Sequence, residues 1–200
     1  EVQLALLLHG FDAVDAELQA LAREAGIAEL IVLRADRTTS LGANLNRLVE
    51  ATDGEIVAKF DDDDLYGQHY LADASFALDY SGAELVGKEA RYLYLEAIDA
   101  TVLQNPHREH RWADLVGGPT MVGHRSTWVS TPFEDRTLGE DTAFQRAVLS
   151  AGGGIYSADR YNFIQMRSAR ADHTWSIGDE RILANGTVHG FGRADSHVLL

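Results

Sequence analysis

Four consecutive carboxylates, at residues 61–64, are the groups in this sequence best suited to chemistry. They end a short run, residues 56–60, whose apolar side chains predict a buried strand. Burial there would strip hydration from charges that also repel one another. A divalent cation with oxygen ligands relieves both costs, so the run predicts a Mg²⁺ or Mn²⁺ site. A solvated acidic turn is the alternative reading of such a run.

The segments before the run predict alternating strands and helices. Residues 2–8 form an apolar stretch typical of a central strand buried on both faces, and residues 13–25 carry apolar side chains at helical spacing. A second strand is expected at 30–33, a second helix at 41–51 and a third strand at 56–60. This order predicts an α/β fold with a mostly parallel central sheet and right-handed crossovers.

Such a sheet would gather polar residues at one edge. His9 and Gly10 end the first strand, Asp36 follows the second, and the aspartate run ends the third. Ligands of open parallel sheets bind at the carboxyl ends of the strands. We therefore expect these residues to lie along one binding edge.

The rest of the chain is less regular. Helices are expected at 68–80 and 140–151, strands at 85–87, 92–95, 155–156 and 161–165, a cationic loop at 105–112, a turn at 117–120 and irregular chain at 131–136. Periodicity is lost after residue 168, and residues 181–200 are interpreted as a C-terminal tail. Without repeats or a linker, the sequence predicts a single domain over residues 1–200.

The composition narrows the classes of function. With 17 Lys and Arg against 31 Asp and Glu, the net charge of −14 disfavours nucleic acid as a partner. The absence of Cys excludes disulfides and fits a reducing compartment. No apolar run is long enough to span a membrane, and the first residues do not read as a signal peptide. We expect a soluble, cytoplasmic protein and leave open a homo-oligomer.

Two motifs in this context resemble the GT-A fold of nucleotide-sugar-dependent glycosyltransferases, closest to family 2. The first is the strand leading into Phe-Asp-Asp-Asp-Asp-Leu-Tyr-Gly, which is similar to the family's Asp-x-Asp metal motif. The second is Gly139-Glu140-Asp141 at the start of a helix, which is similar to its later Glu-Asp pair. The resemblance covers about residues 2–175 and implies a Rossmann-like three-layer sandwich that moves a sugar, from a UDP-sugar foremost, to an acceptor hydroxyl with inversion.

The resemblance also implies roles for individual residues. It implies Asp141 as the catalytic base, with Glu140 beside it. The metal ligands implied are Asp63, Asp61 and the late His173. The remaining positions divide between the nucleotide (His9, Gly10, Asp36, Asn46, Asp61 and Asp62) and the donor or acceptor sugar (Gly118, Pro119, Thr120 and Trp175).

The sequence departs from the family at the ends of the first two strands, which read Leu-His-Gly-Phe and Arg-Ala-Asp-Arg. The Gln-x-x-Arg-Trp motif of processive members is absent, which disfavours a polymer-forming synthase. A non-catalytic nucleotide- or carbohydrate-binding module and a Mg²⁺-dependent nucleotidyltransferase remain as alternatives. The latter normally has a Gly-rich phosphate loop after the first strand, and His9-Gly10-Phe11-Asp12 does not supply one.

Overall fold

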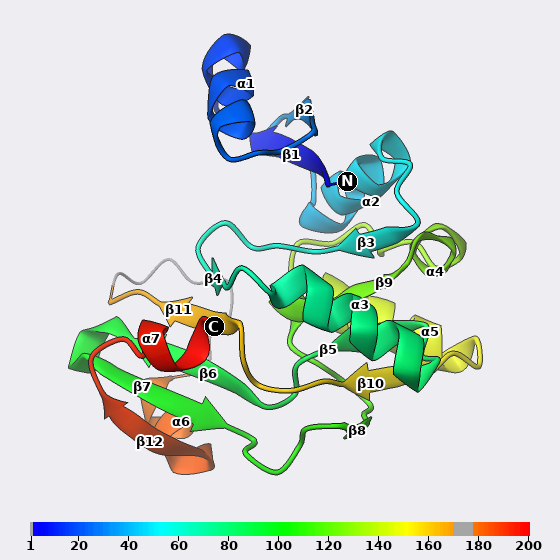
Figure 1. Ribbon diagram of the computed structural model, residues 1–200. Helices are drawn as coiled ribbons and strands as arrows, with labels where there is room; N and C mark the ends of the chain where they lie inside the picture. Colours follow the sequence, from blue (N-terminus) through cyan, green and yellow to red (C-terminus); the bar gives the residue numbers. More distant parts are fainter. Residues whose placement is uncertain (1, 170–177) are drawn as a thin grey trace. The chain divides into compact units, whose positions relative to one another are not determined.

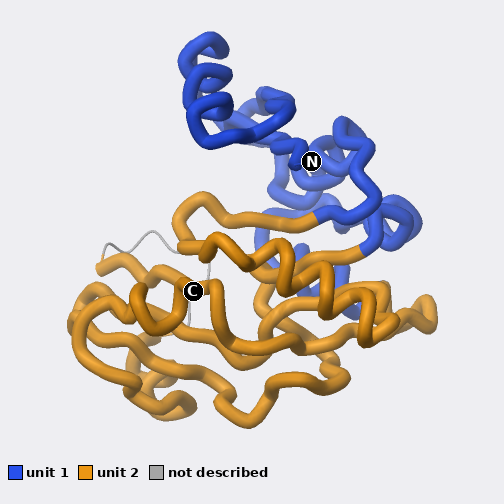
Figure 2. Tube along the Cα trace, in the orientation of Figure 1, with its two compact units in different colours: residues 1–57, 124–147 blue, residues 58–123, 148–200 orange. Residues whose placement is uncertain are grey.

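The computed structural model describes residues 2–169 and 178–200 (Figure 1). The chain divides into two compact units (Figure 2). Unit 1 comprises residues 1–57 and 124–147, and unit 2 comprises residues 58–123 and 148–200. The chain passes between them within β3 (Ile56–Ala58), β9 (Val122–His124) and α5 (Glu140–Ser150). The single domain over residues 1–200 stays a prediction.

Unit 1 begins with the predicted strand–helix–strand motif. β1 (Gln3–His9) pairs in parallel with β2 (Glu29–Ala35), and α1 (Asp15–Glu24) connects them. The prediction that the first strand is a central strand buried on both faces is wrong. Only Leu8 of β1 is buried, because β1 and β2 form a two-stranded sheet in which each strand is an edge.

The core of unit 1 lies among α2 (Leu41–Ala51), α4 (Arg125–Ser130) and the start of α5. The ring of Phe144 stacks on Trp128 at a centroid distance of 4.8 Å and on Phe133 at 4.6 Å. The α2 helix begins where predicted because the Ser40 side chain accepts a hydrogen bond from the backbone N–H of Ala43, at 3.2 Å.

Unit 2 contains two mixed sheets. In the first, β5 (Leu85–Gly87) lies between β9 and β10 (Ile155–Ser157), and β8 (Arg111–Trp112) pairs with β10. The second has the order β12-β7-β6-β11-β4, formed by β12 (Gly186–Phe191), β7 (Ala100–Gln104), β6 (Arg91–Leu95), β11 (Phe163–Arg167) and β4 (Leu65–Tyr66). The α/β class is confirmed, and α3 (Tyr70–Ser81) packs against β5.

The predicted mostly parallel sheet is wrong, since antiparallel pairs outnumber parallel ones in both sheets of unit 2. For one of these pairs, the cause is the length of the connection. β6 and β7 are joined only by a 3-10 turn, η1 (Glu96–Ile98), whereas a parallel pair needs a crossover of a dozen residues or more.

Residues 181–200, interpreted from sequence as a tail, form part of the packing of unit 2. Ile182 of α6 (Asp179–Asn185) joins the apolar cluster of Leu93 and Leu95 on one face of β6. Val198 of α7 (Asp195–Val198) joins the cluster of Tyr92 on the other face. The two helices therefore cover opposite faces of one sheet (Figure 1).

Among the described residues, no helix has both the length and the apolar character that crossing a bilayer would require.

Candidate functional site

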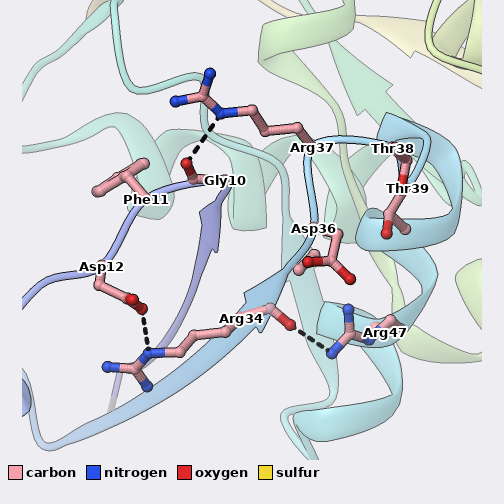
Figure 3. A pocket seen from close by; sticks show the side chains of 10 residues that line it. Gly10, Phe11, Asp12, Arg34, Asp36, Arg37, Thr38, Thr39 and Arg47 are labelled. Atoms are coloured by element: carbon pink, nitrogen blue, oxygen red, sulfur yellow. Dashed lines mark hydrogen bonds and ion pairs between the residues drawn. The ribbon is translucent and has the colours of Figure 1, made fainter.

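A pocket of about 730 Å³ in unit 1 lies at the carboxyl ends of β1 and β2 (Figure 3). It contains two predicted site residues, Gly10 and Asp36, whereas His9, the exposed last residue of β1, is not among its lining residues. The lining consists of Gly10, Phe11, Asp12, Arg34, Ala35, Asp36, Arg37, Thr38, Thr39 and Arg47.

Three guanidinium groups, of Arg34, Arg37 and Arg47, line this pocket together with the carboxylates of Asp12 and Asp36. The Arg34 Nε donates to Asp12 at 3.3 Å, and Arg47 donates to the carbonyl oxygen of Arg34 at 2.9 Å. The Arg37 Nε donates to the carbonyl oxygen of Gly10 at 3.0 Å, so this side chain reaches from the loop after β2 to the end of β1 (Figure 3). Such donors suit an anionic or acceptor-rich ligand.

Gly10 is required by this arrangement for two reasons. Its φ of +78° lies in the left-handed region that side chains disfavour. A Cβ atom at this position would also stand 2.0 Å from the Cγ atom of Arg37. The absence of a side chain at position 10 therefore lets Arg37 lie directly over the end of β1.

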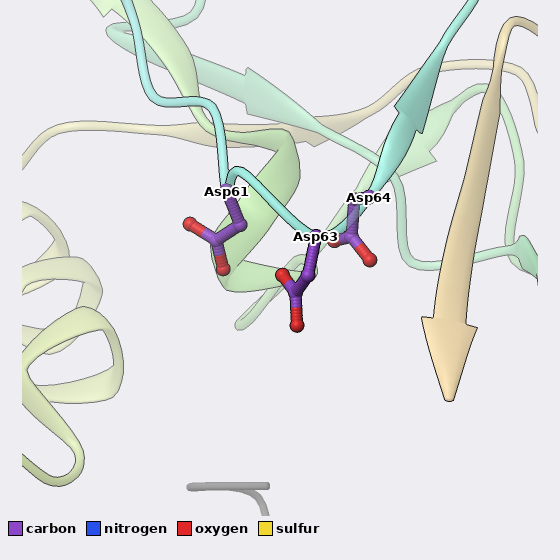
Figure 4. Close-up of side chains that lie close together, drawn as sticks. All are labelled: Asp61, Asp63 and Asp64. Carbon is purple, nitrogen blue, oxygen red and sulfur yellow. The ribbon is translucent and has the colours of Figure 1, made fainter. Parts of the chain in front are cut away.

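The aspartate run in unit 2 forms a cluster of oxygen atoms. Asp61, Asp63 and Asp64 each offer a carboxylate oxygen, and these atoms lie within 4.8 Å of one another. All three side chains come from the loop that leads into β4, with those of Asp61 and Asp63 directed to the same side (Figure 4). The cluster contains Asp61 and Asp63, two of the predicted metal ligands, and adds Asp64, which was not predicted. Asp62, a predicted nucleotide contact, is exposed and lies outside this group.

The electrostatics of the cluster fit a divalent cation. Burial raises the pKa of Asp64 to about 7, and the charges of Asp63 and Asp61 add to the rise. The buried ammonium group of Lys59 forms an ion pair with Asp61 and balances one of the charges. A hard cation with oxygen ligands would relieve the repulsion among these carboxylates and the cost of burying Asp64.

The predicted sugar-contacting turn is a 3-10 helix, η2 (Gly118–Thr120), held by its neighbours in unit 2. The Thr120 hydroxyl donates to the carbonyl oxygen of Gly117 at 2.7 Å and accepts the backbone N–H of Lys88 at 2.8 Å. The carbonyl oxygen of Pro119 accepts a hydrogen bond from the Tyr66 hydroxyl at 2.8 Å. The turn is thus rigidly placed beside the segment that carries the aspartate run.

The predicted catalytic pair opens α5 in unit 1. Asp141 is partly exposed, and its Oδ1 accepts the backbone N–H of Thr142 at 2.6 Å. Glu140 is buried. A carboxylate that keeps access to solvent is able to accept a proton, whereas the burial of Glu140 suits a supporting role.

The α2 helix fixes the chain that approaches this pair. The backbone N–H of Gly42 donates to the carbonyl oxygen of Arg136 at 3.0 Å. Asn46, a predicted nucleotide contact, uses both atoms of its side-chain amide on the backbone of Phe133, each at 2.9 Å. Two residues of α2, Gly42 and Asn46, therefore hold the irregular segment before Asp141.

The structure thus brings the predicted residues together in groups within each unit. Gly10 and Asp36 share a pocket in unit 1, and Asp61 and Asp63 share a cluster in unit 2. That all these residues meet along one edge stays a prediction, because they divide between the two units. His173 and Trp175 lie outside the described residues.

The pocket arginines and the place of Asp64 in the carboxylate cluster were not predicted from the sequence. The signal for the first was present in the order Arg34-Ala35-Asp36-Arg37, which places cations directly at a strand end. For the second, four identical side chains in a row gave no indication of which ones turn inward.

Neither a protein-family model nor a curated protein matches the sequence. Solved structures do match its fold. The chain is similar to S. aureus TarS 1-349 in complex with UDP-GlcNAc, with a TM-score of 0.57, 17% identity, and coverage of 86% of this chain and 52% of that one. For S. aureus TarS 1-349 in complex with UDP, the TM-score is 0.53 and the identity 17%, with coverage of 81% of this chain and 51% of that one. For S. aureus TarS, the TM-score is 0.54 and the identity 15%, with coverage of 82% of this chain and 36% of that one.

This chain spans about half the length of the TarS 1-349 structures. The likeness covers 86% of this chain in the UDP-GlcNAc complex. The chain has the GT-A glycosyltransferase fold.

Proposed function

We propose that this chain is a metal-dependent, inverting glycosyltransferase that moves a sugar from a UDP-sugar to an acceptor hydroxyl. One observation carries the proposal: Asp61, Asp63 and Asp64 gather their carboxylate oxygens within 4.8 Å, in a chain of GT-A fold, at the position of the motif that predicts a metal. A nucleotide diphosphate is an anion that a protein of net charge −14 binds poorly without a bridging cation.

The pocket in unit 1 supplies the nucleotide site of this proposal. Arg34, Arg37 and Arg47 would donate hydrogen bonds to carbonyl or phosphate oxygens, and Asp36 would accept one from a base or ribose. The two similar structures in complex with UDP-GlcNAc or UDP favour a uridine nucleotide as the first to test.

Asp61, Asp63 and Asp64 would hold the cation, and Mn²⁺ and Mg²⁺ both accept such oxygen ligands. When bound, the cation supplies positive charge that stabilises the departing diphosphate. Lys59 would hold the Asp61 carboxylate in place through their ion pair.

Asp141 would act as the general base. The acceptor O–H bond breaks, its proton passes to the Asp141 carboxylate, and the oxygen forms a bond to the anomeric carbon. The bond from that carbon to the diphosphate breaks on the opposite side, and the diphosphate takes the electron pair. A single displacement of this kind inverts the anomeric configuration.

Calorimetric titration of UDP and GDP tests the proposal, with Mn²⁺ or with EDTA, on the wild type and on Asp63→Ala. We expect UDP to bind with Mn²⁺, and we expect EDTA or Asp63→Ala to weaken binding at least about tenfold. The matched control is Asp79→Ala, which removes the same charge from the exposed face of α3. Its affinity should equal that of the wild type.

A second measurement separates transfer from binding alone. Release of UDP from UDP-GlcNAc, with water or a screened hydroxyl compound as acceptor, would exclude a non-catalytic module. Binding of neither nucleotide, with or without metal, would contradict the proposal as stated.

A further inference from the structure

Tyr66 occupies a position between the aspartate run and the η2 turn. Its hydroxyl accepts the backbone N–H of Asp61 at 3.0 Å and donates to the carbonyl oxygen of Pro119 at 2.8 Å. A tyrosine hydroxyl has a single proton to donate. Tyr66 donates that proton to Pro119 of the turn and accepts a hydrogen bond from Asp61 of the run. The three residues belong to unit 2.

The ring of Tyr66 is held so that the hydroxyl has little freedom. It lies 4.0 Å from Phe60, 4.9 Å from Tyr70 and 5.2 Å from Phe163, measured between ring centroids. Tyr66 also belongs to β4, where it pairs with Phe163 of β11. A ring packed on three others and fixed in a strand places its hydroxyl at a defined point.

Both partners of the hydroxyl are themselves tethered. The run is attached through Lys59, whose backbone N–H donates to the carbonyl oxygen of Met121 at 2.9 Å and whose side chain pairs with Asp61. The turn is attached through Thr120, whose hydroxyl accepts a hydrogen bond from the backbone N–H of Lys88. Tyr66 therefore links Asp61 of the aspartate run to Pro119 of the η2 turn, and Lys59 links the same two segments a second time. A displacement of the run should then displace the turn.

Resting on the proposed function, we propose that Tyr66 is a positioning residue: its hydroxyl sets the backbone at Asp61 for metal binding and couples that backbone to the Gly118–Thr120 turn. Tyr66 itself touches neither the cation nor the substrate in this role. It acts through the orientation of the Asp61 carboxylate and the placing of the turn.

Tyr66→Phe tests this role because it removes only the hydroxyl and keeps the ring. The matched control is Tyr80→Phe, which removes the same atom from a side chain 58% exposed on α3. Mn²⁺ affinity is measured from the electron paramagnetic resonance signal of the free ion, with UDP present, at a temperature where circular dichroism shows both variants folded. We expect the dissociation constant for Mn²⁺ to rise about tenfold in Tyr66→Phe and to stay within about twofold in Tyr80→Phe.

A purely structural role would lower the melting temperature of Tyr66→Phe without moving the Mn²⁺ affinity of the folded protein, and that result would overturn the inference alone. Absence of Mn²⁺ binding by the wild type would overturn the proposed function and this inference with it. Hydrogen exchange on the wild type covers the case in which Tyr66→Phe does not fold. Addition of Mn²⁺ and UDP should slow exchange in residues 59–66 and 117–121 together, and protection of the first segment alone would contradict the coupling.

Discussion

The Oδ1 atom of Asp64 lies 2.8 Å from the backbone nitrogen of Met166, which donates a hydrogen bond to it. This bond ties the aspartate run to β11 and favours the charged carboxylate, as does the nearby charge of Lys59. Burial and the charges of Asp63 and Asp61 disfavour the charged carboxylate more strongly, so that the pKa of Asp64 rises to about 7. The charge of Asp64 is thus sensitive to pH near neutrality.

Mn²⁺ binding is predicted to weaken as the pH falls through 7, because a cation has to compete with the proton on Asp64. The dissociation constant should rise by up to about tenfold for each pH unit below 7. Titrations of Mn²⁺ between pH 5.5 and 8 measure this dependence. A flat profile across that range would contradict a role for Asp64 as a ligand.

The same raised pKa predicts an effect on stability without metal. Between about pH 4 and pH 7 the folded chain keeps a proton on Asp64 that the unfolded chain has lost. The free energy of unfolding should therefore decrease as the pH rises through this window, by a few kcal/mol at most. Urea unfolding in EDTA measures it, with Asp64→Asn as the variant that should lose this contribution.

The elements with strong local signals were predictable from the sequence. The helix at 41–51 was predictable at its true bounds because its apolar residues repeat at helical spacing and the Asp53-Gly54 turn follows it. β7, β12 and α6 were missed, because they are short and their burial comes from tertiary packing, as at Val102 and Ile182. The mixed sheets were unpredictable for a related reason: strand order depends on contacts far apart in sequence.

The site residues likewise fall into those that a local motif indicates and those that depend on distant contacts. The Asp61 and Asp63 carboxylates and the Asp141 position follow from local motifs, and the sequence indicated them. The inward position of Asp64 depends on its bond to Met166, about a hundred residues later, and no local pattern encodes such a contact. The reach of Arg37 over Gly10 likewise depends on two strands pairing in parallel.

Gly10→Ala is predicted to reduce nucleotide affinity by displacing Arg37, whose Cγ atom lies 2.0 Å from where the new Cβ would be. Strain at a φ of +78° adds about 1 kcal/mol. Gly26→Ala is a matched control, because its φ of +74° imposes similar strain and nothing lies within 4 Å of the added atom. UDP titrations on both variants separate the two effects: equal affinities would show that Arg37 does not contribute to the pocket.

Asp141→Asn is predicted to abolish transfer and to preserve nucleotide binding. The amide keeps the size of the carboxylate and cannot accept the acceptor's proton, so turnover should fall by about 10²–10⁴-fold. The dissociation constant for UDP with Mn²⁺ should change by less than about twofold. Asp53→Asn, an exposed carboxylate in the same unit, is the control and should retain full turnover. Near-normal transfer by Asp141→Asn would remove this residue as the base.

Gly42→Ala is predicted to destabilise unit 1 and to reduce transfer through the segment that leads to Asp141. In an ordinary helix this change stabilises by about 1 kcal/mol. Here the added Cβ would lie 2.0 Å from the carbonyl oxygen of Glu134, so the backbone of 134–136 has to move. We expect a net loss of about 1–3 kcal/mol and a fall in turnover of about tenfold or more.

The comparison for this prediction is Gly54→Ala, where the nearest atom to the added Cβ is a carbonyl oxygen at an ordinary 3.5 Å. Urea unfolding and turnover are measured for both variants. Since the nucleotide pocket does not include Gly42, the change in UDP affinity should be small beside the change in turnover. Stability lost without any loss of turnover would mean that the 134–136 segment does not position Asp141.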